Sequence, residues 1–300
     1  MSSRRLALLS AGLRVAVKPW LARTETPEQA ARDFERAAAL FRQPPHLRLL
    51  RRGAPRLCWI SAGRCAPRRV ILWFHGGAFI AGSARTHRGM LGRLSALAGL
   101  EVCAPEYRLA QEAPFPAAFE DARAAWNALA ELGYAPGDVV LGGDSAGGGL
   151  ALALLAALSR EGVRPRTFVG FSPWTDLALT GPSLAGNAAA DPLLPVERLE
   201  DVVDLVRDGA DPRDPRLSPL YARFENPPPV LFQVGDSEIL RDDTERMAAA
   251  LRAAGGEVTT ETWPGAPHVW QIFDGWVPEA RAALASAAGF VQSSFAATIR

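Results

Sequence analysis

The chain has 300 residues, of which 48% are apolar, and its net charge at neutral pH is +1. A chain of this length can bury one large core, and α/β folds of this size often form a single domain. The basic residues, all arginines except Lys18, are scattered among acidic residues. Because phosphate backbones are bound by clustered basic residues, we expect no nucleic-acid partner.

The three cysteines predict no disulfide framework. They form no Cys-x-x-Cys pair, and their odd number leaves one without a partner: Cys58, Cys65 and Cys103. Disulfides persist mainly in oxidising compartments, so this usage predicts a reducing compartment and a cytoplasmic protein.

The first twenty residues predict an amphipathic helix. Arg14 and Lys18 interrupt the apolar run, and no small-residue cleavage site follows, so we expect no signal peptide. We expect the apolar stripe to pack on its own protein, and membrane-surface binding is the less favoured alternative. Five apolar residues recur at helical spacing: Leu6, Leu9, Leu13, Val17 and Trp20.

Short apolar runs alternate with longer helical patterns from Val70 onward. This alternation predicts an α/β fold with a mostly parallel sheet flanked by helices. A further run at Leu57–Ile60 is a candidate antiparallel edge strand. The predicted buried strands are Val70–Phe74, Val102–Ala104, Val139–Leu141, Phe168–Phe171 and Val230–Val234. The predicted helices span residues 86–98, 117–132, 146–160, 242–254 and 278–296.

Two regions break this pattern. Residues 1–45 look helical and end at Pro44-Pro45, and residues 177–226 hold one helical stretch, Val196 to Val206, among Pro, Asp and Gly clusters. An insertion between neighbouring strands lies near their carboxyl ends, where open α/β sheets bind ligands. We therefore expect 1–45 and 177–226 to form a helical cap over a catalytic domain made of 46–176 and 227–300.

The segment from Gly143 to Gly147 is the strongest motif in the chain. It reads Gly-Asp-Ser-Ala-Gly, follows a predicted buried strand and begins an Ala/Leu-rich helix. This context is typical of a nucleophile elbow, in which a serine hydroxyl projects above the sheet from a strained turn. We therefore predict that Ser145 is a catalytic nucleophile.

A second glycine-rich turn, His75-Gly76-Gly77-Ala78, directly follows the strand Val70–Phe74. Such a turn points backbone N–H groups at the cavity, where they stabilise a developing oxyanion. We predict an oxyanion hole formed by the N–H groups of Gly76, Gly77 and Ala146. We expect His75 to fix the loop through hydrogen bonds rather than to transfer protons.

His268 is the candidate base. In the fold that the elbow indicates, the triad follows the chain order serine, acid, histidine. Of the four histidines in the chain, only His268 follows Ser145.

These motifs resemble those of the bacterial hormone-sensitive-lipase-like esterases, a family of capped α/β-hydrolases. His75 to Ala78 are similar to its His-Gly-Gly-Gly motif with Ala in the last place, and Gly143 to Gly147 match its Gly-Asp-Ser-Ala-Gly elbow. Three further segments are similar: 106–118, with Gln111 where Pro is usual, 172–177 and 268–271. The resemblance implies an α/β-hydrolase fold with a helical cap.

The resemblance also suggests the remaining site residues. The family motif Asp-Pro-Leu-x-Asp, aligned on Leu240 and Asp242, places Glu238 where the family has its catalytic Asp. Asp236 and Asp242 are the alternatives for the acid. We expect Ala78 and Phe79 to line the substrate pocket. Ala78 keeps its N–H and so leaves the oxyanion donors intact, while its methyl group narrows the alcohol side of the pocket.

The function that follows is a serine carboxylesterase acting on small esters with short to medium acyl chains through an acyl-enzyme. An amidase, a lactonase or an acyltransferase would use the same triad and remains an alternative. A non-catalytic ligand-binding relative is a further alternative, although such relatives have lost the histidine. No metal-ligand spacing is present, so we expect no metal and no cofactor. The oligomeric state stays open, with a homodimer as one alternative.

Overall fold

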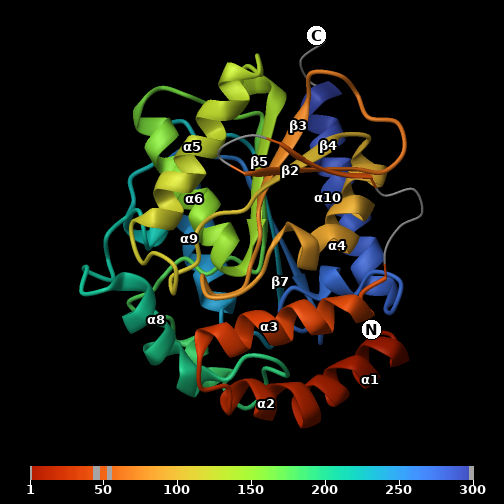
Figure 1. The fold of residues 1–300 in the computed structure, drawn as a ribbon, viewed down its shortest axis with the longest axis vertical. Coiled ribbons are helices and arrows are strands. Elements are labelled where there is room, and N and C mark those ends of the chain that lie inside the picture. The colour runs from red at the N-terminus through yellow and green to blue at the C-terminus, as the bar shows by residue number, and fades with distance from the viewer. Residues whose placement is uncertain (1, 43–47, 53–55, 297–300) are drawn as a thin grey trace.

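Eight strands of the described chain form one sheet in the order β1-β2-β4-β3-β5-β6-β7-β8 (Figure 1). The structure is a computed structural model that describes residues 2–42, 48–52 and 56–296. The pairs from β4 through β8 are parallel, whereas β2 runs antiparallel to both of its neighbours. The strands are β1 Arg48–Arg52, β2 Leu57–Ser61, β3 Val70–Phe74, β4 Glu101–Pro105, β5 Val139–Asp144, β6 Thr167–Phe171, β7 Val230–Gly235 and β8 Val258–Trp263.

Helices cover both faces of this sheet, as the alternating pattern predicted. α4 and α10 pack on one face and α5, α6 and α9 on the other (Figure 1). Successive side chains of β3 alternate between the two cores, so Leu72 packs with α6 and Trp73 packs with α4. The helices are α4 Ala84–Ala98, α5 Ala117–Glu131, α6 Ser145–Arg160, α9 Arg241–Ala253 and α10 Pro278–Ala296. These helices match the predicted ones to within two residues at each end, and among the predicted buried strands only β5 differs by more, ending three residues beyond Leu141.

The N-terminal helices and the 177–226 insertion lie side by side at one end of the sheet (Figure 1). Lys18 Nζ donates hydrogen bonds to the carbonyl oxygens of Ala188 and Asp191, at 2.6 and 2.8 Å, and Arg14 reaches Ala190. The helices here are α1 Arg4–Gly12, a π-helical turn Leu13–Val17, α2 Lys18–Ala22, α3 Pro27–Ala37, α7 Ser183–Gly186 and α8 Leu199–Arg207. Short 3₁₀ turns span Ala38–Leu40, Pro136–Asp138, Val196–Arg198, Pro219–Tyr221 and Trp270–Phe273.

Two details differ from the sequence predictions or fall outside the described residues. The run at Leu57–Ile60 forms an antiparallel strand, but β1, which no pattern had indicated, lies outside it as the edge. The predicted boundary at residues 45 and 46, with Pro44-Pro45, lies outside the described residues. No helix within the described ranges is long and apolar enough to cross a bilayer.

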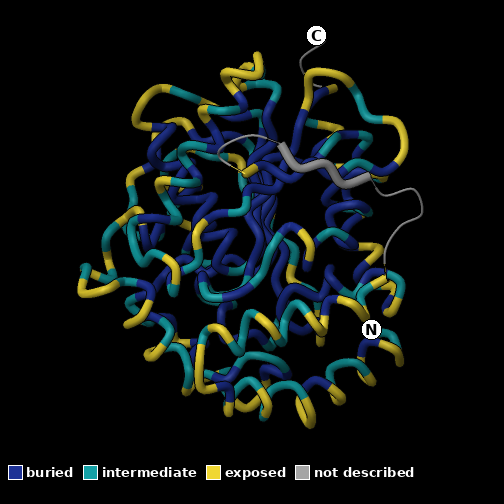
Figure 2. The backbone as a smooth tube through the Cα atoms, in the orientation of Figure 1, coloured by how far each residue is buried: buried dark blue, intermediate teal, exposed yellow. Residues whose placement is uncertain are grey.

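The N-terminal apolar stripe packs only in part. Leu6 and Leu13 are buried, whereas Trp20 is 37% exposed. The opposite face of the same helix carries Leu8 and Val15, which are 74% and 78% exposed, and Figure 2 shows this outer face lying at the surface. The π-helical turn at Leu13–Val17 adds a residue to that turn, so positions beyond it rotate away from the face that the regular helical spacing predicted.

The start of α1 is attached to the last helix of the described chain. Leu6 is fully buried in a cluster with Trp270 and Ala280. Beside it, the carboxylate of Glu279 accepts hydrogen bonds from the backbone N–H and the hydroxyl of Ser3, at 2.6 and 3.0 Å. Apolar burial and these hydrogen bonds together hold α1 against α10.

We predict that Leu6→Ala lowers the free energy of unfolding by about 2–5 kcal/mol, because it leaves a cavity in a closed apolar cluster. Leu8 lies on the same helix but is 74% exposed, so Leu8→Ala is the matched control and should change stability by less than about 0.5 kcal/mol. Urea unfolding of both variants measures the difference. Equal losses would show that α1 does not pack through Leu6.

Candidate active site

A strained turn carries Ser145 between β5 and α6. Its φ is +52°, in the left-handed region that non-glycine residues rarely adopt. The turn fits only because two neighbours lack a side chain. A Cβ at Gly147 would collide with the carbonyl oxygen of Phe74, and one at Gly143 would collide with the backbone of Gly147. The half-buried Ser145 therefore sits at the carboxyl end of β5, as the elbow motif predicted.

The glycine-rich turn after β3 lies directly beside this elbow. A Cβ at Gly76 would meet the side chains of Asp144 and Ser145, so the close approach requires glycine there. The chain then passes through positive φ at three successive residues, Gly77 (+124°), Ala78 (+55°) and Phe79 (+62°). This backbone curls around the space above Ser145.

Hydrogen bonding changes the set of oxyanion donors that the sequence suggested. The N–H of Gly76 donates to Asp144 Oδ2 at 3.0 Å and therefore points into the protein. The N–H groups of Gly77 and Ala78 make no hydrogen bond to any described residue. The N–H of Ala146 lies in the first turn of α6, where no helical acceptor exists. The available donors are thus those of Gly77, Ala78 and Ala146.

His75 anchors this loop, in the role that its position suggested. Its ring stacks on Tyr107 with centroids 4.3 Å apart, and its Nδ1 lies 3.0 Å from the carbonyl oxygen of Gly76. The Tyr107 hydroxyl donates to the carbonyl oxygen of His75 at 2.7 Å. Burial lowers the pKa of His75 to about 4, so the ring is neutral at physiological pH and its Nδ1–H donates to Gly76.

His268 and Glu238 form a buried pair at the ends of β8 and β7. His268 Nδ1 lies 2.7 Å from Glu238 Oε2. The other carboxylate oxygen, Oε1, accepts from the hydroxyl of Ser172 at 2.7 Å and the N–H of Gly235 at 2.6 Å. Burial alone would lower the pKa of His268, but the hydrogen bond and charge of Glu238 outweigh it, so the pKa is raised above its ordinary value.

The two alternative acids lie elsewhere. Asp236 Oδ1 accepts from the N–H of Gly265 at 2.8 Å. Asp242 occupies the first turn of α9 and its Oδ2 accepts from the N–H of Ser183 at 2.6 Å. Of the three carboxylates that the sequence left open, only Glu238 is hydrogen-bonded to His268.

Backbone contacts bring the loop of Ser145 and the loop of His268 together around the end of β6. The N–H of Trp174 donates to the carbonyl oxygen of Ser145 at 2.9 Å. Two residues earlier, Ser172 contacts both Glu238 and the N–H of Val269. No hydrogen bond joins the Ser145 hydroxyl to His268 within the described ranges. Such bonds are often long in unliganded enzymes and tighten when substrate binds.

The insertion contributes two supports that sequence reasoning missed. Asp191 Oδ2 accepts from the N–H of Ile239 at 2.9 Å, and Asn187 Nδ2 donates to the carbonyl oxygen of Glu238 at 2.8 Å. Both side chains therefore hold the loop that carries the acid. Ser172 lies in a segment that the resemblance had marked, but no sequence signal connects Asp191 or Asn187 with Glu238.

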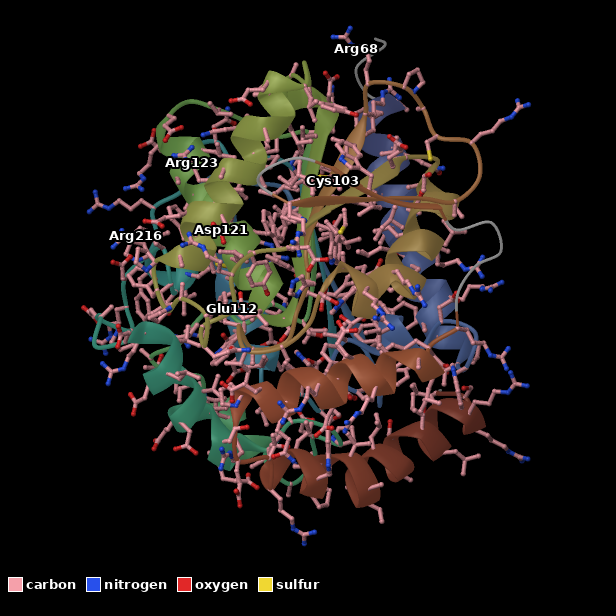
Figure 3. The ribbon with its side chains drawn as sticks, viewed as in Figure 1. Arg68, Cys103, Glu112, Asp121, Arg123 and Arg216 are labelled. Carbon is pink, nitrogen blue, oxygen red and sulfur yellow. The ribbon has the colours of Figure 1, made fainter. Side chains whose placement is uncertain are left out.

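A narrow apolar crevice runs beside the glycine-rich turn. Its free volume is about 20 Å³, and Phe79, Leu150 and Val206 are among the residues that line it. Ala78 does not line this crevice; it is half-buried and packs against the adjacent core. The guanidinium of Arg216 lies over the ring of Phe115, 4.8 Å from its centroid. Figure 3 shows Arg216 with Asp121 on the side of the molecule that carries α5 and α6.

No metal centre accompanies these residues. Within the described ranges, no group of three or more His, Cys, Asp or Glu side chains is arranged to hold a metal ion. Cys103 is buried in the sheet (Figure 3), and burial raises the pKa of its thiol.

Comparisons with known proteins identify relatives over most of the chain. A family model described as alpha/beta hydrolase fold matches residues 71–272. An acetyl-hydrolase of Streptomyces hygroscopicus is 41% identical over 237 residues, which cover 79% of each chain. The crystal structure of an esterase from the bacterial hormone-sensitive lipase family has a TM-score of 0.91 and 37% identity, covering 98% of this chain and 99% of that one. The structure of EstE5 soaked with p-nitrophenyl butyrate has a TM-score of 0.93 and 32% identity, covering 98% and 100%.

We predict that Glu238→Gln lowers kcat by several orders of magnitude. The amide keeps the shape of the side chain but loses the charge that stabilises protonated His268, and an equivalent Asp-to-Asn change in a trypsin-like protease cost about ten-thousandfold. The charge of Glu238 also raises the pKa of His268. Since the base must be neutral to accept a proton, the acidic limb of kcat/KM lies above the ordinary histidine pKa and should move to lower pH in Glu238→Gln. Turnover measured against pH tests both effects.

Asp236→Asn and Asp242→Asn are the matched controls, because each removes one carboxylate charge within four residues of Glu238. Both should leave the acidic limb in place and change kcat only slightly. If Asp236→Asn or Asp242→Asn lost most of its kcat while Glu238→Gln stayed active, the assignment of Glu238 as the acid would be rejected.

Proposed function

We propose that this chain, a carboxylic ester hydrolase belonging to the bacterial hormone-sensitive-lipase branch of the α/β-hydrolase fold family, cleaves esters through an acyl-enzyme on Ser145. The observation that carries the mechanism is the buried His268–Glu238 hydrogen bond of 2.7 Å. It lies at the same end of the sheet as the strained Ser145 turn and follows it in the chain order of this fold. A nucleophile, a base and an orienting acid are thereby available in one site.

The proposed reaction begins when Ser145 Oγ attacks the ester carbonyl carbon and His268 Nε2 accepts the hydroxyl proton. Glu238 stabilises the resulting imidazolium through Nδ1–H. The tetrahedral intermediate carries its negative charge on the former carbonyl oxygen, and the N–H groups of Gly77, Ala78 and Ala146 are its proposed donors. Protonated His268 then gives its proton to the departing alkoxide, and the alcohol leaves.

Water completes the cycle by the same steps. His268 removes a proton from the water molecule as its oxygen attacks the acyl-enzyme carbonyl carbon. The second tetrahedral intermediate collapses, Ser145 Oγ regains a proton from His268, and the carboxylic acid is released. The mechanism requires neither a metal ion nor a cofactor.

The acyl group is proposed to be short. Phe79, Leu150 and Val206 are among the residues that narrow the crevice beside the glycine-rich turn after β3 to about 20 Å³. A space of this size admits about one water-sized group, so a long acyl chain entering it would have to displace the side chains that line it. The 41% identical relative is named an acetyl-hydrolase, which supports the same size class.

We further propose that residues 1–45 and 177–226 act together as one cap on a catalytic unit formed by 46–176 and 227–300. The hydrogen bonds from Lys18 and Arg14 to residues 188–191 support this division. The contacts of Asp191 and Asn187 with the loop of Glu238 connect the cap to the catalytic residues.

We predict that Ser145→Ala lowers ester turnover on the order of a millionfold, the effect typical of losing a triad nucleophile, while the thermal unfolding midpoint stays close to that of the parent protein. p-Nitrophenyl esters of increasing acyl length measure the parent activity, which should be greatest for the shortest chains. An anilide and a lactone of matched size separate ester hydrolysis from the amidase and lactonase alternatives. Residual turnover of more than a few per cent would remove Ser145 from the mechanism.

A second prediction concerns the cap. Deleting the first 40 residues removes Leu6 from its cluster and Lys18 from residues 188 and 191, so we expect a lower unfolding midpoint and a higher KM. Lys18→Met tests the bridge alone, with Arg23→Met as the matched control because Arg23 is exposed. A truncated protein as stable and as selective as the full chain would contradict the cap assignment.

A further inference from the structure

A second buried histidine–carboxylate pair lies behind the catalytic turn. His87, on α4, is 1% exposed, and its Nε2 lies 3.0 Å from Asp144 Oδ2. The same oxygen accepts the N–H of Gly76 at 3.0 Å, and Asp144 Oδ1 accepts from Trp73 Nε1 at 2.9 Å. One carboxylate thus connects α4 and β3 with Gly76, in the glycine-rich turn that we propose as the oxyanion loop (Gly76 to Ala78). The mechanism proposed above assigns no role to His87.

The other side of His87 faces the N-terminal helices. The ring of Phe34, on α3, meets the His87 ring edge-on, with centroids 5.6 Å apart and planes at 84°. The next residue, Glu35, accepts a hydrogen bond from the hydroxyl of Ser83 and pairs with Arg85 at 3.6 Å, both at the start of α4. Ser83 is also the N-cap of α4, and its carbonyl oxygen lies 3.2 Å from His87 Nδ1. Helix α3 therefore contacts both the imidazole and the side chain of Ser83, whose carbonyl oxygen lies beside that imidazole.

The electrostatics favour a fixed ion pair at this position. Burial alone would lower the pKa of His87, but the charge and hydrogen bond of Asp144 outweigh it and raise the pKa. For Asp144, burial would raise the pKa, yet the charge of His87 holds it below its ordinary value. A charged acceptor makes stronger hydrogen bonds than a neutral one, so the ionised Asp144 holds the N–H of Gly76 firmly.

We propose that His87 is a positioning residue for ester hydrolysis. Through its bond to Asp144, it makes the position of the oxyanion loop depend on how α3 packs against α4. This inference rests on the function proposed above, because it concerns the donors that stabilise the tetrahedral intermediate. Gly76 is joined directly to Gly77, so its attachment to Asp144 sets where the N–H groups of Gly77 and Ala78 point. When α3 is packed against His87, His87 holds Asp144 in the orientation that directs these N–H groups at the oxyanion.

If His87 has this role, its replacement should weaken the binding of the transition state more than the binding of the substrate. His87→Gln keeps a donor of hydrogen bonds but removes the positive charge and the ring that Phe34 contacts. We expect kcat for p-nitrophenyl butyrate to fall by about tenfold to a hundredfold with little change in KM, because misplaced donors weaken only the developing oxyanion. Butylboronic acid adds to the serine oxygen as a tetrahedral adduct, and its inhibition constant should rise by a similar factor.

Ser95→Ala is the matched control. Ser95 lies on the same helix and is fully buried, and its hydroxyl accepts from the N–H of Ala62 at 3.1 Å, away from the elbow. This variant should lower the unfolding midpoint and leave the boronate inhibition constant unchanged. A loss of stability in His87→Gln without a change in kcat or boronate inhibition would overturn the proposal, since His87 would then be structural only.

A double-mutant cycle tests the connection to α3. Phe34→Ala should weaken boronate inhibition in the parent protein and have a smaller effect in the His87→Gln background, because its influence passes through His87. Equal effects of Phe34→Ala in the two backgrounds would overturn the connection. Should His87→Gln fail to fold, Phe34→Ala alone decides the matter, and an unchanged boronate inhibition constant in that variant rejects the proposal. Failure of the proposed function is separate, because it would appear as ester turnover in Ser145→Ala.

Discussion

The left-handed backbone of Ser145 is the constraint on which the rest of the site depends. A turn this tight between a buried strand and a buried helix brings α6 against the backbone of β3, and only glycine at position 147 permits the contact. The same closeness places Asp144 beneath the loop that follows β3. The glycine-rich turn after β3 is therefore held by the residue that precedes Ser145, and the strain at Ser145 is offset by the packing of two core layers around it.

Two histidine–carboxylate pairs of similar chemistry flank this turn and differ in what surrounds them. His268 and Glu238 lie in loops beyond the strands, and their contacts go to the segment after β6 and to the 177–226 insertion. His87 and Asp144 lie among β3, α4 and α3 and bond to Trp73, Gly76 and Thr86. Under the proposed mechanism the first pair gains and loses a proton during each turnover. The second pair takes no part in that transfer, and its proposed role is to hold the glycine-rich turn after β3 in place.

The sequence predicted those features that depend on local pattern. Apolar runs such as Val70–Phe74 specified the strands because parallel strands are buried on both faces, and the elbow motif specified the position of Ser145 because glycine spacing determines the turn. The family resemblance selected Glu238 from three neighbouring carboxylates. The fold class and the family were confirmed, since the sheet is mostly parallel and the relatives are esterases of that family.

The remaining features depend on contacts between distant segments. The N–H of Gly76 is taken up by Asp144, which lies 68 positions later in the chain. The motif around Gly76 does not show this contact, and the sequence therefore predicted Gly76 to be an oxyanion donor. The support that Asp191 gives to Ile239 spans 48 positions. β1 escaped prediction because its Arg-rich sequence lacks the apolar character of the other strands. The exposure of Trp20 was missed because the π-helical turn before it changes the helical phase that the pattern assumed.

The attachment of α1 to α10 has a consequence for how the protein acquires its structure during synthesis. Ser3 and Leu6 are synthesised well before their partners Glu279 and Ala280, which lie more than 270 positions later in the chain. At about 5–20 residues per second, all of the intervening chain must be translated before α1 has a surface to dock on. α1 is thus made before the sheet but docks only after the start of α10 has formed, and until then the nascent chain exposes Leu6.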